Sequence, residues 1–164
     1  PTCISGWSRR RPSQVRRRCR CSVTEPAVRQ PFLFPVRVYW EDTDGGGIVY
    51  YANYLKFLER ARSEWLRALG LDQGALQRDE RIQFAVVEAQ VRYRRPARYD
   101  DLLAVSAAVQ FWRGASVTFA QEIRRDAAGG ELLVEATIRA ACLDAVTLRP
   151  RPLPRRLLED LSRG

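Results

Sequence analysis

The sequence predicts an α+β domain in which a five-stranded antiparallel sheet wraps around one long helix. Apolar residues alternate with period two in five segments, as in half-buried strands, and one long segment after the first of them has helical spacing instead. The links RGA and AAGG between the later strands are short and rich in turn residues, which favours an antiparallel meander. With 46% apolar residues, the chain has enough of them to bury the core of one such domain.

The alternation begins at Phe34 and predicts a first strand over residues 34–41, with Trp40 on its inner face. After three glycines the spacing becomes helical, and a helix is expected from residues 49–51 to Leu69, with Gly70 as its C-terminal stop. Its apolar positions cover roughly half of the circumference, which is wider than a surface helix needs. The sheet is therefore expected to enclose this helix.

Residues 71–81 are predicted to be a short polar connection before four further strands. These strands are expected near residues 85–93, 103–111, 117–123 and 132–142, with Gln121 interrupting the third apolar run. Three prolines after residue 149 should end the sheet, and RRLLEDL is expected to form a final helical turn. Because an open sheet leaves unpaired edges, pairing with a second copy of the chain is expected.

The formal net charge of the 164 residues is +9, but most of it lies at the N-terminus. Residues 1–30 hold eight arginines and one acid, so residues 31–164 have a net charge of only +2. The first segment has no hydrophobic periodicity and is predicted to be a disordered leader, either a tail or sequence that is not native. The folded domain is assigned to residues 31–164. Its near-neutral charge predicts no specific nucleic acid partner, and DNA binding through arginines 9–20 is left as an alternative.

The absence of histidine limits the chemistry. Ser-His-Asp and Cys-His catalysis and His-ligated metal hydrolysis are excluded in their usual forms, so a general base must be a carboxylate, a tyrosine or Lys56. Three of the four cysteines lie in the leader, which predicts no disulfide framework and a cytoplasmic location. No apolar run has the length of a membrane span. No metal site is expected, because a calcium loop starting at Asp42 would have Asn53 where a glutamate belongs.

Residues 38–66, VYWEDTDGGGIVYYANYLKFLERARSEWL, place three carboxylates beside three glycines just before the helix. An aspartate before glycines is often a turn former whose carboxylate binds backbone amides, and Asp42 is expected to have this structural role. A carboxylate beside a helix N-terminus is also a plausible catalytic pair, because the first N–H groups of a helix are unpaired and favour negative charge. Both interpretations of Asp44 are open on these grounds.

This stretch, with RPARYDDLL at residues 95–103 and RPLP at 151–154, resembles the hotdog-fold 4-hydroxybenzoyl-CoA thioesterase family, especially its Tol-Pal-associated acyl-CoA thioesterase branch. The resemblance covers about residues 32–160. It implies hydrolysis of an acyl-CoA thioester to a free acid and coenzyme A, with no cofactor apart from the substrate. It also implies a homodimer or homotetramer with sites between subunits. Acyl carrier protein is a further expected partner, and a position peripheral to the inner membrane is compatible with this branch.

By this resemblance Asp44 is the catalytic carboxylate, acting either as nucleophile or as general base. Tyr51 stands where the Tol-Pal branch usually has histidine and where the 4-hydroxybenzoyl-CoA branch has tyrosine, whose backbone N–H polarises the carbonyl. Gly47 is expected to shape the loop between them. The alternative function is a non-catalytic protein at the inner membrane that binds an acyl carrier or acts as a scaffold through the same cleft.

Four further positions are candidates for binding. Arg94, Arg95 and Arg98 are expected to hold the phosphates of coenzyme A, because guanidinium groups suit phosphate, although solvated strand-end charge explains them almost as well. Ser116 either donates a hydrogen bond in the site or faces solvent. On the helix, Glu59 and Arg62 are expected to form an ion pair at the edge of the buried face, three residues apart.

Overall fold

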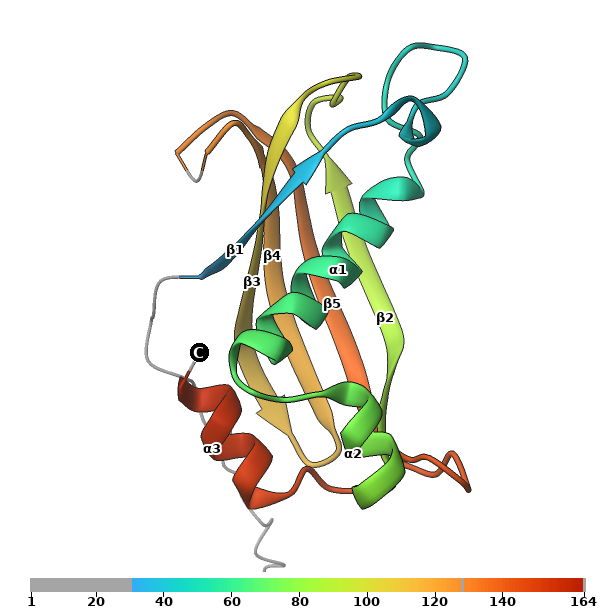
Figure 1. The fold of residues 1–164 in the computed structure, drawn as a ribbon, viewed down its shortest axis with the longest axis vertical. Coiled ribbons are helices and arrows are strands. Elements are labelled where there is room, and N and C mark those ends of the chain that lie inside the picture. Colours follow the sequence, from blue (N-terminus) through green and yellow to red (C-terminus); the bar gives the residue numbers. More distant parts are fainter. Residues whose placement is uncertain (1–30, 128, 164) are drawn as a thin grey trace, which may run out of the picture.

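The computed structural model describes residues 31–127 and 129–163, which form one five-stranded antiparallel sheet with helices on one side of it (Figure 1). The sheet order is β1-β3-β4-β5-β2, and this architecture confirms the predicted fold class. The predicted leader lies outside the described residues. The elements are β1 (Phe32–Arg37), η1 (Trp40–Asp42), α1 (Asn53–Ala68), α2 (Gln73–Glu80), β2 (Ile82–Tyr93), β3 (Leu102–Arg113), β4 (Ser116–Arg125), β5 (Leu132–Asp144) and α3 (Arg155–Arg163).

The four later strands are confirmed, each extending a few residues beyond its apolar run. β3, β4 and β5 are antiparallel neighbours, as the short links between them require, and they form the predicted meander. β1 pairs with β3 at one edge of the sheet, and β2 pairs with β5 at the other. The sheet therefore ends on both sides in strands that come early in the chain.

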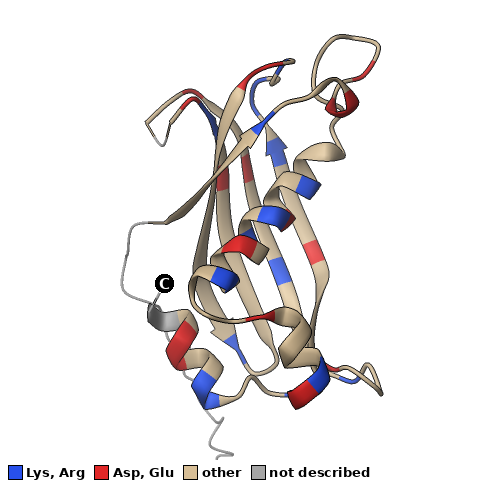
Figure 2. Ribbon diagram, viewed as in Figure 1, with Lys and Arg blue, Asp and Glu red and all other residues tan. Residues whose placement is uncertain are grey.

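Helix α1 lies across one face of the sheet (Figure 1), and the apolar side predicted from its spacing is the side that packs there. Phe57, Leu58 and Ala61 are completely buried, and Trp65 is nearly so. The opposite side of α1 carries charges of both signs (Figure 2). None of the helices in the described part of the chain is long and apolar enough to cross a membrane.

The predicted helix start at residues 49–51 is wrong, because α1 begins at Asn53. The backbone N–H of Asn53 donates to the Tyr50 carbonyl at 2.9 Å, which closes a turn over Tyr51 and Ala52 before the helix. Ala52 occupies the capping position and provides no side-chain hydrogen bond. The apolar spacing runs through this turn, so periodicity alone does not reveal it.

Three other predictions about the elements need correction. The first strand ends at Arg37, because the Asp42 carboxylate accepts the Tyr39 N–H at 2.9 Å and bends the chain into η1; Trp40 is consequently 69% exposed. Residues 71–81 are not a simple connection but contain α2, which is capped by the Asp72 carboxylate on the N–H of Ala75 at 2.6 Å. The predicted final turn is the full helix α3.

Candidate active site

The loop between η1 and α1 is held in a tight reversal by its own backbone. The Asp44 N–H donates to the Ile48 carbonyl at 2.9 Å, and the Gly47 N–H donates to the Asp44 carbonyl at 3.0 Å. Gly47 has a φ of 72°, in the left-handed region that glycine adopts without strain. A Cβ at Gly47 would meet no atom within 4 Å, so backbone conformation rather than crowding requires glycine here.

The two aspartates of this loop have different surroundings. Asp42 is 7% exposed, its carboxylate binds the Tyr39 N–H, and its carbonyl accepts from the Tyr50 N–H and from the Asn53 side chain, both at 2.9 Å. This confirms the structural role expected of Asp42. The Asp44 carboxylate is exposed, and Oδ1 accepts the Gly46 N–H at 2.8 Å. Within the described residues Oδ2 of Asp44 has no hydrogen-bond donor.

Tyr51 presents a backbone donor just before α1. Its N–H has no acceptor among residues 31–127 and 129–163, whereas its carbonyl accepts the Tyr93 hydroxyl at 3.0 Å. The preceding residue is tied to Asp42 through the Tyr50 N–H. The loop that carries Asp44 and the turn that carries the Tyr51 N–H are therefore joined at Asp42, and the end of β2 supports the turn.

The segment after β2 lies against the same loop. The Val49 N–H donates to the Ala97 carbonyl at 2.9 Å, and the Ala97 N–H donates to the hydroxyl of buried Tyr54 at 2.8 Å. Burial is the main cause of the raised pKa of Tyr54. Arg98, the next residue, is thereby placed beside the candidate catalytic loop.

The predicted phosphate-binding arginines do not have equal surroundings. Arg94 pairs with Glu135 at 2.6 Å, and Arg95 pairs with Glu131 at 2.9 Å. Arg98 is exposed, and its guanidinium forms no ion pair within the described part of the chain. Of the three arginines, Arg98 is the one whose charge the described carboxylates leave uncompensated.

Ser116 is not brought to this site within one chain. It lies in the hairpin between β3 and β4, where its hydroxyl donates to the Arg113 carbonyl at 3.1 Å. That hairpin is at the opposite end of the sheet from the loop before α1 (Figure 1). The geometry of a single chain therefore favours the interpretation of Ser116 as a turn residue.

The expected ion pair between Glu59 and Arg62 is wrong. Glu59 accepts the Ser63 hydroxyl at 2.6 Å, and Nη1 of Arg62 donates to Oε1 of Gln121 at 2.7 Å. The sequence contained a signal for this contact, because Gln121 is the polar residue that interrupts the apolar alternation of β4. Spacing along the chain could not show which residue of α1 it would meet.

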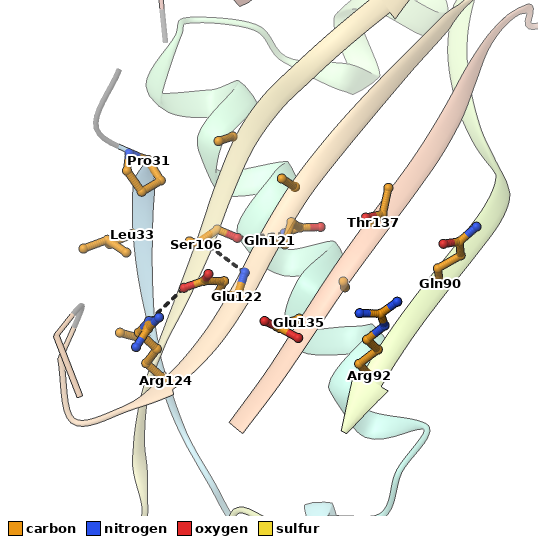
Figure 3. Close-up of a pocket in the computed structure, with 14 residues that line it drawn as sticks. Pro31, Leu33, Gln90, Arg92, Ser106, Gln121, Glu122, Arg124, Glu135 and Thr137 are labelled. Atoms are coloured by element: carbon orange, nitrogen blue, oxygen red, sulfur yellow. Dashed lines mark hydrogen bonds and ion pairs between the residues drawn. The ribbon is translucent and has the colours of Figure 1, made fainter. Parts of the chain in front are cut away.

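A large cavity of about 560 Å³ lies elsewhere, on the sheet face that points away from α1 (Figure 3). Its floor is made of small residues such as Ala104 and Ser106, and the Glu122–Arg124 pair lies at its side. Asp44, Gly47 and Tyr51 are absent from its lining. This cavity is therefore not the predicted catalytic site, although it is large.

Comparison with known proteins identifies the fold and the family. Residues 38–161 match the thioesterase-like superfamily. The chain belongs to this superfamily. The matched region of this thioesterase-like protein contains the loop with Asp44, strands β2 to β5 and Arg98, and it excludes the leader and β1.

Individual relatives agree with the resemblance seen in the sequence. The acyl-CoA thioester hydrolase YbgC of Escherichia coli O6:H1 is 43% identical over 131 residues, which cover 80% of this chain and 96% of that protein. The acyl-CoA thioesterase YbgC of Haemophilus influenzae is 42% identical over 124 residues, covering 76% and 89%. A probable thioesterase from Bartonella henselae superposes with a TM-score of 0.71 at 35% identity, covering 76% and 100%. The predicted hotdog thioesterase family is thereby confirmed, and the names of the relatives are consistent with the Tol-Pal branch.

Proposed function

We propose that this protein hydrolyses acyl-CoA thioesters, with the Asp44 carboxylate and the Tyr51 backbone N–H acting on the same carbonyl group. The proposal is supported by two groups on segments joined through Asp42: an exposed carboxylate and a backbone N–H that has no acceptor among the described residues. The matched superfamily and the acyl-CoA thioesterases among its relatives support this class of reaction.

The chemistry requires few groups. The leaving thiol has a pKa of roughly 8.5, so it departs as thiolate without a general acid. Asp44 either attacks the carbonyl carbon, giving an anhydride that water then opens, or removes a proton from an attacking water. In both routes negative charge develops on the carbonyl oxygen, where an aligned N–H donor stabilises the transition state by about 3 kcal/mol. No cofactor is needed beyond the coenzyme A of the substrate.

Arg98 is assigned to the phosphates of coenzyme A. It follows Ala97, which is bonded to Val49 next to the catalytic loop, and its charge is uncompensated by described carboxylates. Arg94 and Arg95 are assigned a secondary role, because each must first break its ion pair with a glutamate before it can bind phosphate. Both pairs are exposed, so the exchange costs little. Thioesters of acyl carrier protein carry the same phosphopantetheine arm and are a second substrate source.

The outer edge of β2 has no partner strand among the described residues, and it is assigned to a second copy of the chain. Val86 and Val87 on this edge are 52% and 50% exposed, which is unusual for strand valines. Antiparallel pairing of two β2 strands would join the two sheets, and the active sites would lie between the subunits. The assembly is then a homodimer, or a homotetramer built from two such dimers.

The assignment is tested by thiol release from acyl-CoA with the wild type and with Asp44→Asn. Loss of the carboxylate is expected to lower kcat at least about 100-fold, the usual range for a positioned acid or base. Glu41→Gln is the matched control, because Glu41 is an exposed carboxylate three residues away in the same region. Equal thiol release by wild type and Asp44→Asn would contradict the catalytic role of Asp44, and no thiol release by either would favour the non-catalytic scaffold.

A further inference from the structure

Gln121 lies in the centre of the helix–sheet interface and uses all of its hydrogen-bonding groups there. It is 2% exposed, and its amide nitrogen donates to the Leu58 carbonyl of α1 at 3.1 Å and to the Ser106 carbonyl of β3 at 2.9 Å. Its side-chain oxygen accepts a hydrogen bond from the Arg62 guanidinium at 2.7 Å. A buried glutamine satisfied in this way holds one guanidinium group in a fixed position between α1 and the sheet.

Arg62 has no ion-pair partner in the described part of the chain, and the charge of Glu59 acts on it only from beyond ion-pair distance. None of the described carboxylates lies within 4.0 Å of its guanidinium, and nearby Glu59 accepts from Ser63 instead. The Phe119 ring lies 6.0 Å from the guanidinium carbon, and burial is the main cause of the lowered pKa of Arg62. The charge of Glu59 offsets only part of this burial, so a ligand that accepts hydrogen bonds would stabilise the guanidinium.

Arg62 lines a cavity of about 110 Å³ between α1 and the sheet, here called the Arg62 cavity. Its walls are mainly apolar, whereas its polar lining comes from Glu59, Arg62, Ser63 and Gln73. A cavity of roughly 150 Å³ with apolar walls accommodates a benzene-sized group, so this one holds a chain of a few carbon atoms. The apolar walls are Leu66, Phe84, Val86, Val117, Phe119, Ala140 and Leu161.

The position of the cavity relates it to the active site of a second copy rather than to that of its own chain. Arg62 lies nine residues after Asn53, which is about 13 Å along the helix axis from the start of α1. Phe84 and Val86 belong to the first half of β2, whereas Tyr93, at the end of β2, contacts Tyr51. Antiparallel pairing of two β2 strands places the end of one beside the beginning of the other.

We propose that the Arg62 cavity receives the distal end of the acyl group, and that Arg62 binds an oxygen atom carried there. This proposal rests on the proposed thioesterase function and on pairing through β2. The ligand chemistry is a hydrogen-bond acceptor on a short apolar chain, as in an oxo-acyl or a carboxy-acyl group. The guanidinium donates to this oxygen while Gln121 keeps it in place.

The test compares pentanoyl-CoA, 4-oxopentanoyl-CoA and glutaryl-CoA, whose acyl groups have nearly the same length and differ in their distal oxygen. We expect wild-type kcat/KM, corrected for hydrolysis without enzyme, to be at least tenfold higher for one or both oxygen-bearing substrates. Arg62→Met should lose this preference, so that its kcat/KM values for the three substrates become similar. A preference for glutaryl-CoA identifies an anionic group, and a preference for 4-oxopentanoyl-CoA identifies a neutral one.

Two further variants separate ligand binding from a purely structural contact. Arg60→Met makes the same change at an exposed position of α1 and should leave the preference unchanged. Arg62→Lys keeps a cation and should retain part of it. Ratios between substrates do not depend on the folded fraction, so loss of stability in Arg62→Met does not affect the result. An equal decrease for all three substrates in Arg62→Met, or no preference in the wild type, would overturn the proposal. Absence of hydrolysis of every substrate would instead contradict the proposed function.

Discussion

Asp42 and Asp44 lie two residues apart, and their neighbours decide what each contributes. The carboxylate of Asp42 is used by the Tyr39 N–H, and its carbonyl binds the residues that precede α1. Asp44 contacts only the Gly46 N–H of its own loop among the described donors and remains exposed. The buried aspartate therefore builds the site, and the exposed one is free to meet a substrate.

At the same scale, a substitution of Gly47 tests the backbone conformation of the loop. We expect Gly47→Ala to lower the free energy of unfolding by about 1 kcal/mol, because an L residue is disfavoured at a φ of 72°. The shifted loop should also reduce kcat. Gly45→Ala is the control, since its Cβ would enter open space and its φ is not positive, and it should change stability by less than about 0.5 kcal/mol. Urea unfolding of both variants measures the difference; equal effects would contradict the backbone argument.

At the scale of elements, the strands were predictable from the sequence and the turns were not. Alternation located β3 to β5 because these strands have several side chains buried in the core. It also located β2, although only Ile82 of that strand is buried. It failed at Trp40, whose apolar character continues the pattern although the Asp42 carboxylate has already turned the chain. The sequence motif at residues 38–66 identified Asp44 and Gly47 as candidate site residues. The contact between Arg62 and Gln121 depends instead on how α1 crosses β4, which spacing along the chain does not encode.

Helix α2 provides a prediction about an element. Asp72 caps its first turn by accepting the Ala75 N–H. The helix has only eight residues, so few other interactions stabilise it. We expect Asp72→Ala to lower the free energy of unfolding by about 1 kcal/mol. Asp79→Ala, near the other end of α2, removes the same charge without a cap and should be neutral or slightly stabilising. Comparable losses in both variants would show that charge, not capping, is responsible.

At the scale of the whole molecule, the outer edge of β2 is the surface that most clearly lacks a partner among the elements that the structure describes. Val87 has no partner on β5, because the register shifts between Val86 and Glu88. We expect Val87→Lys to prevent pairing through this edge, giving a monomer in sedimentation equilibrium and at least a tenfold loss of activity. Val146→Lys makes the same change at a residue that is 70% exposed and lies outside the strands. This variant should form the same oligomer as the wild type. A fully active, monomeric wild type would contradict a site between subunits.

The most direct measurement of the proposed chemistry is the position of a bound thioester. A crystal structure of Asp44→Asn with an acyl-CoA that it does not hydrolyse should place the carbonyl oxygen within about 3.2 Å of the Tyr51 nitrogen. The side chain at position 44 should face the carbonyl carbon. A thioester bound elsewhere, such as in the cavity on the outer face of the sheet, with the Tyr51 N–H still unpaired, would contradict the assignment of both residues.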